Sequence, residues 1–446
     1  DKKYQNAYLG EDGPISGYKG ATSMMSTFAR VNYSYRGRYM ATATGRLDGS
    51  STLSPEHRWD FFPSFSLAWN IAEEDFMKPI AKGTKKTVSQ LKLRAGWGQT
   101  GNAGTNMAHI GYYKPINSIG GQSAMAQGAW TNPDLVWETN WQVNAGIDAS
   151  FFKDRLNLVF DAFYKQNNDL IVTAEYGPTL ASTADAYLYT AVPDINAGSI
   201  KNVGFDVNLT STNIQIDRLG AYPFSWNSDL NFSLVRNEVL SLQSDSAVLE
   251  GKRQFKTSTR TYCVSKVGEA PGMFWGFKTD GLIQNTEQLK ELTRASSTDV
   301  GDINYVDLNS DGKIDESDKT YIGNPNPKFT FGFGNTLNWG PWSLNIALTG
   351  SYGNDVYNLL RSKLEGMDRG GVNQLRSVLD CARVVDDVDA DGNVVGKKIE
   401  NSSTNVPRPN SVSDGGNAAN VISDRYVEDA SYLRIQSIGL TYNVPD

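Results

Sequence analysis

Strict alternation of apolar and polar residues, sustained over long segments, is the feature that most constrains how this chain can fold. From Trp141 to Phe151 every odd-numbered residue is apolar, whereas Asn140, Gln142 and Asn144 stand at even positions. Successive side chains of a β-strand point to opposite faces, so a period of two predicts strands with one apolar and one polar face. The pattern recurs at residues 29–35, 91–97, 156–164, 202–209, 226–234 and 329–333.

Strand length and connection length distinguish two ways of burying such strands. In a soluble sandwich the apolar face forms the core, whereas in a membrane barrel it meets lipid and the polar face lines a wet lumen. The segments run ~10–14 residues, against ~5–6 in ordinary sheets. Short turns at residues 36–38, 153–155 and 338–341 alternate with intermediate connections at 72–89 and 212–223 and with long segments at 98–139, 169–200, 239–327 and 354–430. We therefore predict an all-β fold, an antiparallel transmembrane β-barrel with short periplasmic turns and long extracellular loops.

Composition agrees with this fold. The 21 Tyr, 18 Phe and 10 Trp concentrate near strand ends, as interfacial girdles require. The net charge of −7 argues against nucleic acid as a partner, because neutralising phosphates takes clustered Lys and Arg. The two cysteines, Cys263 and Cys381, fall in predicted long loops. They could pair in an oxidising compartment, although two unrelated thiols is the simpler interpretation.

The strand count suggests that the polypeptide continues beyond this sequence. About eleven strands can be recognised by their alternation, and an odd number leaves two unpaired edges that lipid would not tolerate. The sequence starts at Asp1 without a secretion signal and stops at Asp446, where a strand is finishing. We expect residues 1–446 to be part of one barrel domain, with further strands supplied by sequence outside this range.

An acidic segment at residues 307–318 has the spacing of a calcium loop. Gly312 stands at its sharp bend, and Ca²⁺ takes about six to eight oxygen ligands in such loops. The predicted ligands are Asp307, Asn309, Asp311, the backbone carbonyl of Lys313, Asp315 and Asp318. We predict a structural Ca²⁺ here; the alternative is an unmetallated turn rich in Asx residues. The similar stretch at residues 386–392 lacks an acidic twelfth position and is predicted to be a solvated hairpin.

Several short blocks stand in an order that resembles one family. They lie at residues 28–35, 46–51, 58–64, 91–102, 324–327, 350–355 and 431–435. The chain is similar in these blocks to SusC-like TonB-dependent outer-membrane transporters, the RagA/SusC-type family. The resemblance implies a barrel of about 22 strands with an N-terminal plug, energised by TonB and covered by a SusD-like surface lipoprotein. It implies import of oligosaccharide or peptide. The plug, the TonB-contacting segment, the N-terminal extension and the last strands have no counterpart in residues 1–446.

Ligand contacts are predicted at aromatic residues in long loops or near strand mouths, because aromatic faces stack on sugar rings and peptide side chains. The candidates are Trp130, Trp137, Trp275 and Phe277. Loop packing is the alternative role for each. Polar lumen-facing residues would form the conduit and satisfy one another and water: Asn140, Gln142, Asn144, Asn202, Asp206, Asn208, Asp229 and Asn231.

Catalysis finds no support in the sequence. The two histidines, His57 and His109, have no partners at zinc-ligand spacing, and no motif presents a nucleophile. We therefore predict a transporter subunit of the outer membrane and not an enzyme. The competing interpretation is a secreted, calcium-stabilised, all-β glycan-binding protein. Dependence on detergent would favour the barrel, and solubility of the intact protein without detergent would favour the glycan-binding protein. An outer-membrane barrel enzyme would need a nucleophile that the sequence does not offer.

Overall fold

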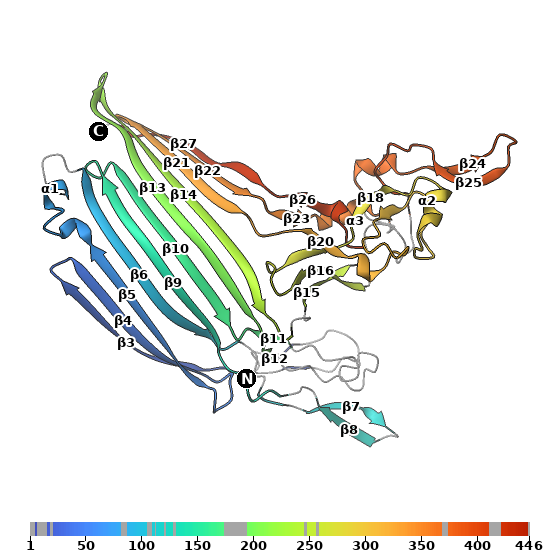
Figure 1. The fold of residues 1–446 in the computed structure, drawn as a ribbon, viewed down its shortest axis with the longest axis horizontal. Coiled ribbons are helices and arrows are strands. Elements are labelled where there is room, and N and C mark those ends of the chain that lie inside the picture. The colour runs from blue at the N-terminus through green and yellow to red at the C-terminus, as the bar shows by residue number, and fades with distance from the viewer. Residues whose placement is uncertain are drawn as a thin grey trace. The chain divides into compact units, whose positions relative to one another are not determined.

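The computed structural model describes residues 5–6, 16–17, 21–81, 87–104, 109–111, 113–119, 122–127, 131–173, 194–244, 248–255, 258–367, 373–409 and 421–444. Its main element is an antiparallel sheet of 11 strands in which strands consecutive along the chain are neighbours (Figure 1). This confirms the predicted antiparallel sheet and its strand number. The strands are β3 (Met24–Tyr35), β4 (Tyr39–Ser50), β5 (Trp59–Asn70), β6 (Val88–Asn102), β9 (Glu138–Phe151), β10 (Leu156–Asn168), β13 (Ser199–Leu219), β14 (Tyr222–Ser241), β21 (Phe329–Trp339), β22 (Trp342–Tyr352) and β27 (Tyr432–Tyr442).

Two compact units divide the chain. The first comprises residues 1–78, 91–146 and 163–200, and the second comprises residues 79–90, 147–162 and 201–446. No helix in the described part of the chain is long and apolar enough to cross a lipid bilayer.

In the first unit, β3, β4 and β5 pair in unbroken register, with Tyr35 opposite Tyr39 and Tyr39 opposite Trp69. The turn at residues 36–38 is as short as predicted, and Arg36 and Gly37 adopt the positive φ values of 51° and 67° that close it. A buried cluster of Leu53, Phe62, Ala103, Leu135 and Trp137 lies at the long-loop ends of these strands. The unit's smaller elements are β1 (Gln5–Asn6), β2 (Ser16–Gly17), η2 (Ile71–Glu73), β7 (Tyr113–Ile119), β8 (Gln122–Gln127), β11 (Ile171–Thr173) and β12 (Asp194–Asn196), with α1 (Lys78–Ala81) at its boundary.

In the second unit, β14, β21, β22 and β27 pair in succession, and Trp339 faces Trp342 across the predicted short turn. One predicted connection was wrong. Residues 212–223 are not a loop of intermediate length, because β13 continues to Leu219 and β14 begins at Tyr222. The apolar residues change face there: Val207 and Leu209 are odd-numbered, whereas Ile214 and Ile216 are even-numbered. The period of two persists through the change, and so does the strand.

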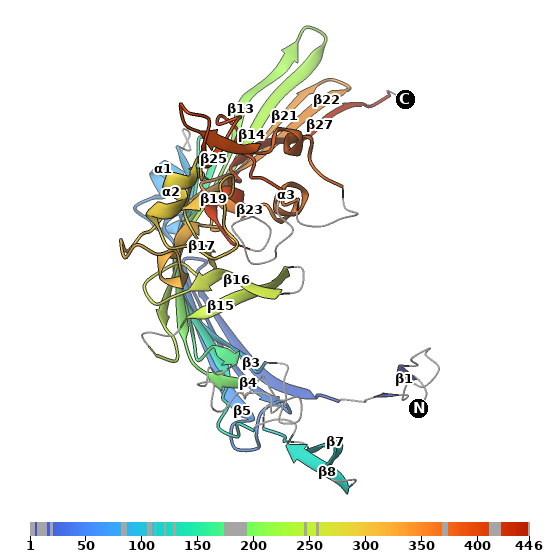
Figure 2. The same cartoon turned by 90° about the vertical axis from the view of Figure 1, so that its right-hand side faces the viewer.

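The long segments after β14 and after β22 fold into what we call the loop module, residues 249–323 and 355–429. It contains a four-stranded sheet of β15 (Leu249–Phe255), β16 (Ser258–Ser265), β17 (Met273–Gly276) and β20 (Thr320–Gly323); β15 and β16 lie side by side in Figures 1 and 2. The remaining elements are β18 (Thr279–Leu282), α2 (Thr286–Glu291), β19 (Ile303–Tyr305), η3 (Glu316–Asp318), β23 (Asp355–Tyr357), α3 (Leu359–Glu365), η4 (Arg376–Asp380), β24 (Val384–Val388), β25 (Val394–Ile399), η5 (Asp424–Tyr426) and β26 (Val427–Asp429).

The loop module has its own core. Ile283 and Tyr426 are fully buried, and both belong to one cluster with Phe274 and Tyr357. Charged pairs are buried beside this cluster, including Arg425 with Glu365. Cys263 lies on β16 and Cys381 follows η4, and both are free thiols, so the simpler interpretation of the cysteines holds.

Candidate functional site

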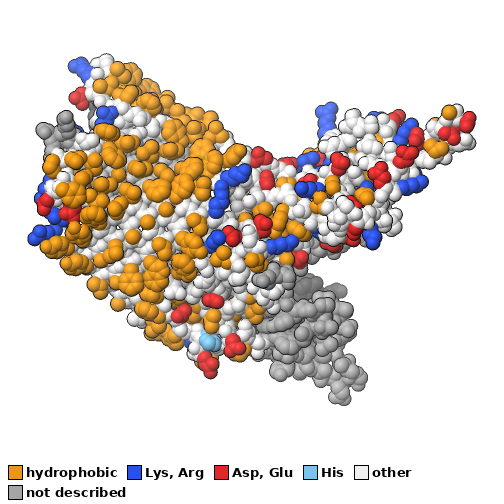
Figure 3. All heavy atoms as spheres, viewed as in Figure 1, with side chains coloured by type: hydrophobic (Ala, Val, Ile, Leu, Met, Phe, Trp, Pro, Cys, Tyr) orange, Lys and Arg blue, Asp and Glu red, His pale blue; other side chains and the backbone are white. Residues whose placement is uncertain are grey.

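Strand register gives the main sheet two unlike faces. Between β21 and β22, Thr330, Gly332 and Thr336 stand opposite Ser351, Thr349 and Asn345 on what we call the polar face. The intervening residues form the apolar face, where Leu337 stands opposite Leu344. Figure 3 shows hydrophobic side chains gathered over the sheet strands on the side that it presents.

Aromatic side chains form a row on the apolar face of the second unit. The rings of Phe160 and Phe205 stack with centroids 5.8 Å apart, and Phe205 stacks on Phe232 at 5.9 Å. Phe232 stacks on Phe329 at 5.3 Å, and Phe329 stacks on Tyr352 at 5.2 Å. This row crosses five strands, as an interfacial aromatic girdle of a membrane barrel does.

Apolar residues of these strands are not enclosed. Val143 and Ile147, on β9, are 45% and 38% exposed. A soluble sandwich would bury them in its core. The buried hydrophobic clusters of the described residues lie instead in the loop module and around Trp137. The apolar side chains of the sheet are therefore open to their surroundings, as the lipid-facing side of a membrane barrel requires.

Side chains on the polar face bond to one another across neighbouring strands. In the second unit Asn208 Nδ2 donates to Asn231 Oδ1 at 2.6 Å, and Ser233 Oγ donates to Asp206 Oδ1 at 2.6 Å. Gly332 carries no side chain beside them, and a hollow of ≈ 420 Å³ lies there. Its polar lining includes Asp161, Asp206, Asn208, Asn231, Ser233 and Thr349.

The polar face of the first unit is similar but carries cations. Arg46 Nε donates to Asp48 at 2.7 Å and its Nη2 donates to Ser26 Oγ at 3.1 Å. Arg30 Nε donates to Thr44 Oγ1 at 3.1 Å. A hollow of ≈ 490 Å³ is lined here by Arg46, Asp48, Asn140 and Gln142, among others. Both hollows offer donors and acceptors suited to hydroxyl and amide groups.

The predicted calcium loop is closed by its own hydrogen bonds. Asp307 Oδ1 accepts from Ser310 N at 2.7 Å, and its Oδ2 accepts from Gly312 N at 2.8 Å. Asp318 is fully buried, and its two oxygens accept from Leu308 N and Asp315 N. Gly312 has the positive φ of 79° expected at the sharp bend.

The loop carries oxygen atoms of the kind that bind Ca²⁺. These atoms are not arranged around a metal ion. Asp307 Oδ2 and the two Asp318 oxygens each accept one hydrogen bond and keep a second lone pair for Ca²⁺. Asp307 Oδ1 and Asp315 Oδ1 already accept two hydrogen bonds each. Within the described ranges, however, no group of three or more His, Cys, Asp or Glu side chains is placed to hold a metal ion. The calcium site therefore stays a prediction. The second acidic stretch is the predicted hairpin, because β24 and β25 pair on either side of it.

The predicted ligand-contacting aromatics are placed apart. Trp137 is 3% exposed in the first unit's cluster, packs edge-on against Phe62 at 5.5 Å and donates from Nε1 to Arg58 O. In the loop module, Lys266 Nζ lies 3.6 Å above the ring of Trp275, which also meets Tyr321 edge-on at 5.2 Å. Trp130 lies outside the described residues.

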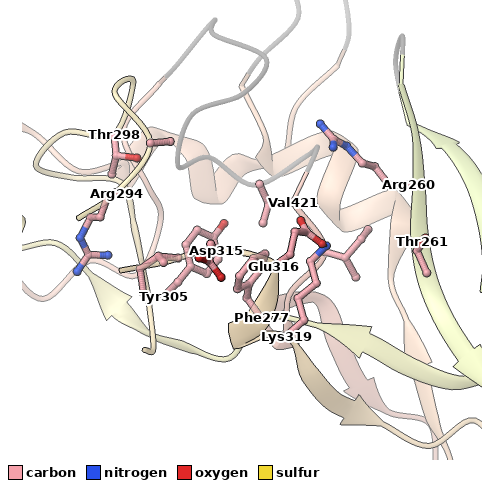
Figure 4. A pocket seen from close by; sticks show the side chains of 13 residues that line it. Arg260, Thr261, Phe277, Arg294, Thr298, Tyr305, Asp315, Glu316, Lys319 and Val421 are labelled. Atoms are coloured by element: carbon pink, nitrogen blue, oxygen red, sulfur yellow. The ribbon is translucent and has the colours of Figure 1, made fainter. Parts of the chain in front are cut away.

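One cavity brings a predicted aromatic residue and part of the acidic loop together. It has a volume of ≈ 430 Å³ in the loop module. Phe277, Asp315, Glu316 and Lys319 line it (Figure 4). Lys319 Nζ pairs with Glu316 at 2.6 Å and lies 5.3 Å from the Phe277 ring. Sequence reasoning missed this cavity, because Arg260 and Val421 on its rim are far apart in sequence.

Comparisons with known proteins agree with this fold. Residues 2–366 match the family model described as TonB dependent receptor-like, beta-barrel. TonB-dependent receptor P26 of Formosa agariphila is 30% identical over 435 residues, covering 96% of this chain and 40% of the relative. TonB-dependent receptor SusC of Bacteroides thetaiotaomicron is 26% identical over 440 residues, covering 96% and 38%. The chain thus spans about two fifths of the length of these relatives.

Solved structures show the same fold. The RagAB peptide importer in its closed-closed state superposes with a TM-score of 0.71 at 21% identity, covering 98% of this chain and 43% of that one. The RagAB peptide transporter superposes with a TM-score of 0.69, also at 21% identity, covering 94% and 41%. An exposed apolar face, a hydrogen-bonded polar face and the family match point to one conclusion: the chain belongs to the TonB-dependent receptor-like β-barrel family and is part of an outer-membrane barrel of the SusC-like type.

Proposed function

We propose that this chain forms part of the barrel of an importer that takes nutrient oligomers, oligosaccharides or oligopeptides, across the outer membrane. The observation that supports it most is the pairing of an outward apolar face with a hydrogen-bonded polar face on the same strands. A wall of this kind is stable in lipid and leaves a wet passage on its inner side. Import would draw energy through TonB, which the family's name invokes.

The chemistry of the polar face supports this substrate class. Amide, hydroxyl and carboxylate groups such as Asn208, Asn231 and Asp206 exchange hydrogen bonds readily with hydroxyls and peptide groups. The titles of the RagAB structures call that protein a peptide transporter or importer. Both oligosaccharide and peptide fit the polar lining.

A SusD-like surface lipoprotein is the proposed partner, with the loop module as its docking surface. The exposed apolar residues there would supply contact area: Leu379 is 83% exposed, Val394 is 62% exposed and Val395 is 60% exposed. A docked partner would cover these apolar groups and remove them from water. Trp275 and Phe277 are retained as proposed ligand contacts, with Lys266 moving off Trp275 when a ring stacks there.

A structural Ca²⁺ in residues 307–318 is proposed to stiffen the loop module. Asp307, Asp311 and Asp318 carry carboxylates that the ion would draw on while they keep their bonds to the loop's amides. The loop itself would contribute no chemistry to import.

The test begins with the full-length protein purified natively in detergent. We expect a surface lipoprotein to co-purify, and the complex to bind members of an oligosaccharide or peptide panel in calorimetry. Deletion of the full-length gene should abolish uptake of the bound class, and complementation should restore it. If the intact protein were soluble without detergent, the glycan-binding alternative would replace the importer.

A further inference from the structure

The segment that follows β5, residues 71–78, is held by one carboxylate. Glu74 is 8% exposed. Its Oε1 accepts from the Tyr39 hydroxyl at 2.6 Å and from Trp69 Nε1 at 3.0 Å, and its Oε2 accepts from Arg38 Nη1 at 3.1 Å. Three donors on β4, β5 and the turn before β4 thus converge on a single side chain of the segment.

These donors place the segment on the apolar side of the sheet. Tyr39 stands opposite Trp69, and their rings stack with centroids 6.4 Å apart. The same register continues with Ala41 opposite Leu67 and Ala43 opposite Phe65, all residues of the apolar face. Because Glu74 bonds to Tyr39 and Trp69, the chain turns back toward the apolar face of the sheet after β5.

Phe76 lies on this segment and is 65% exposed. The backbone N–H groups of Met77 and Lys78 both donate to Glu74 O, which fixes the turn that carries it. Charged groups stand on either side: Asp75 pairs with Arg38 at 3.0 Å and with Lys78. A single exposed aromatic needs no explanation on a soluble surface. This one, however, lies on a segment that is bonded to the apolar face, on which Phe65 is 54% and Leu67 is 63% exposed.

We propose that residues 71–78 are a lipid anchor at the short-turn end of the barrel. Phe76 inserts at the boundary between phospholipid headgroups and acyl chains, and Lys78 lies at the level of the phosphates. Aromatic and cationic side chains are the pair that membrane interfaces favour. Glu74 is a positioning residue: its bonds to Tyr39 and Trp69 hold Phe76 at the interface. The inference rests on the outer-membrane location and not on what the barrel imports.

The experiment measures the depth of position 76 in a bilayer. The full-length protein, with Cys263→Ser, Cys381→Ser and any other cysteines replaced, receives Phe76→Cys labelled with an environment-sensitive fluorophore. It is then placed in phospholipid nanodiscs. We expect blue-shifted emission and quenching by a spin label carried at the lipid interface. Leu67→Cys is the positive control, and Leu379→Cys, 83% exposed in the loop module, is the negative control.

Other results would contradict the anchor. Quenching of position 76 by aqueous iodide alone would place Phe76 in water. Protection from both quenchers would mean that another part of the polypeptide covers it. Addition of Glu74→Gln to the labelled protein should weaken lipid quenching while leaving the Leu67 control unchanged. Unaltered quenching in that variant would overturn the positioning role of Glu74.

Discussion

The ring of Phe331 lies directly over Gly350 of the neighbouring strand. A Cβ added at Gly350 would lie 2.4 Å from Cε1 of that ring. The same relationship recurs in the first unit, where Trp59 covers Gly49 and Phe61 covers Gly45. Glycines on the apolar face therefore act as seats for cross-strand aromatics, which shield the backbone that the glycine leaves bare.

Replacement of Gly350 by Ala should destabilise the sheet. The new methyl group must displace Phe331, which contacts Phe329 in the aromatic row, and overpacking of this kind costs about 1–3 kcal/mol. The free energy of unfolding of the full-length protein in detergent, from denaturant titration, measures it. Gly439→Ala on β27 is the matched control, since nothing lies within 4 Å of a Cβ there. Equal unfolding midpoints for the two variants would contradict the idea that the Phe331 ring needs the space left by Gly350.

Removal of Asp302 should loosen the loop module. Asp302 is fully buried and accepts from Arg408 Nε at 2.8 Å and Nη2 at 3.0 Å. Breaking a buried pair typically costs ~3–5 kcal/mol, and the lower end applies because Arg408 is partly exposed. We expect Asp302→Ala to accelerate proteolysis and amide exchange throughout the module. Lys398→Ala is the control, because the pair of Lys398 with Asp387 is exposed. This substitution should lower the free energy of unfolding by at most about 1 kcal/mol. Similar proteolysis rates for both variants would argue against the role of the pair.

Attachment of residues 71–78 should depend on pH. Hydrogen bonds from Tyr39 and Trp69 lower the pKa of Glu74, and Arg38 adds to the effect. A lowered folded-state pKa means that the stabilisation is fully present above the ordinary value of about 4.3 and is lost as pH falls through the lowered one. Protection of the Met77 and Lys78 amides from hydrogen exchange should therefore persist at neutral pH and fall in acid below about pH 4. Glu74→Gln should abolish this pH dependence; a retained dependence would assign it to another group.

Calcium should protect the acidic loop from protease. If the ion binds within residues 307–318, a chelator should speed cleavage there, and Asp307→Asn with Asp311→Asn should be cleaved rapidly with or without calcium. Asp389→Asn at the β24–β25 turn is the control, because that hairpin is predicted to hold no metal. The prediction fails if chelator leaves the cleavage rate of the unaltered protein unchanged. Calorimetric titration with Ca²⁺ provides the direct measurement, and weaker lipoprotein attachment in the double variant would link the loop to docking.

The sequence alone was enough to predict the strands of the main sheet, their two faces and the family. Alternation is a local property, since each residue's face follows from its neighbours' positions along an extended backbone. The alternation correctly located the short turns at residues 36–38, 153–155 and 338–341. It failed at residues 212–223, where the apolar residues move from odd-numbered to even-numbered positions.

Tertiary structure alone decided which loop residues are buried and what they meet. Asp302 and Arg408 are 106 positions apart, and no periodicity marks Ile283 or Tyr426 as core residues. Trp137 and Trp275 look alike as loop tryptophans in sequence, yet one lies in a buried cluster and the other lies beneath a lysine. Burial and pairing depend on contacts between distant segments, and those contacts exist only once the chain has folded.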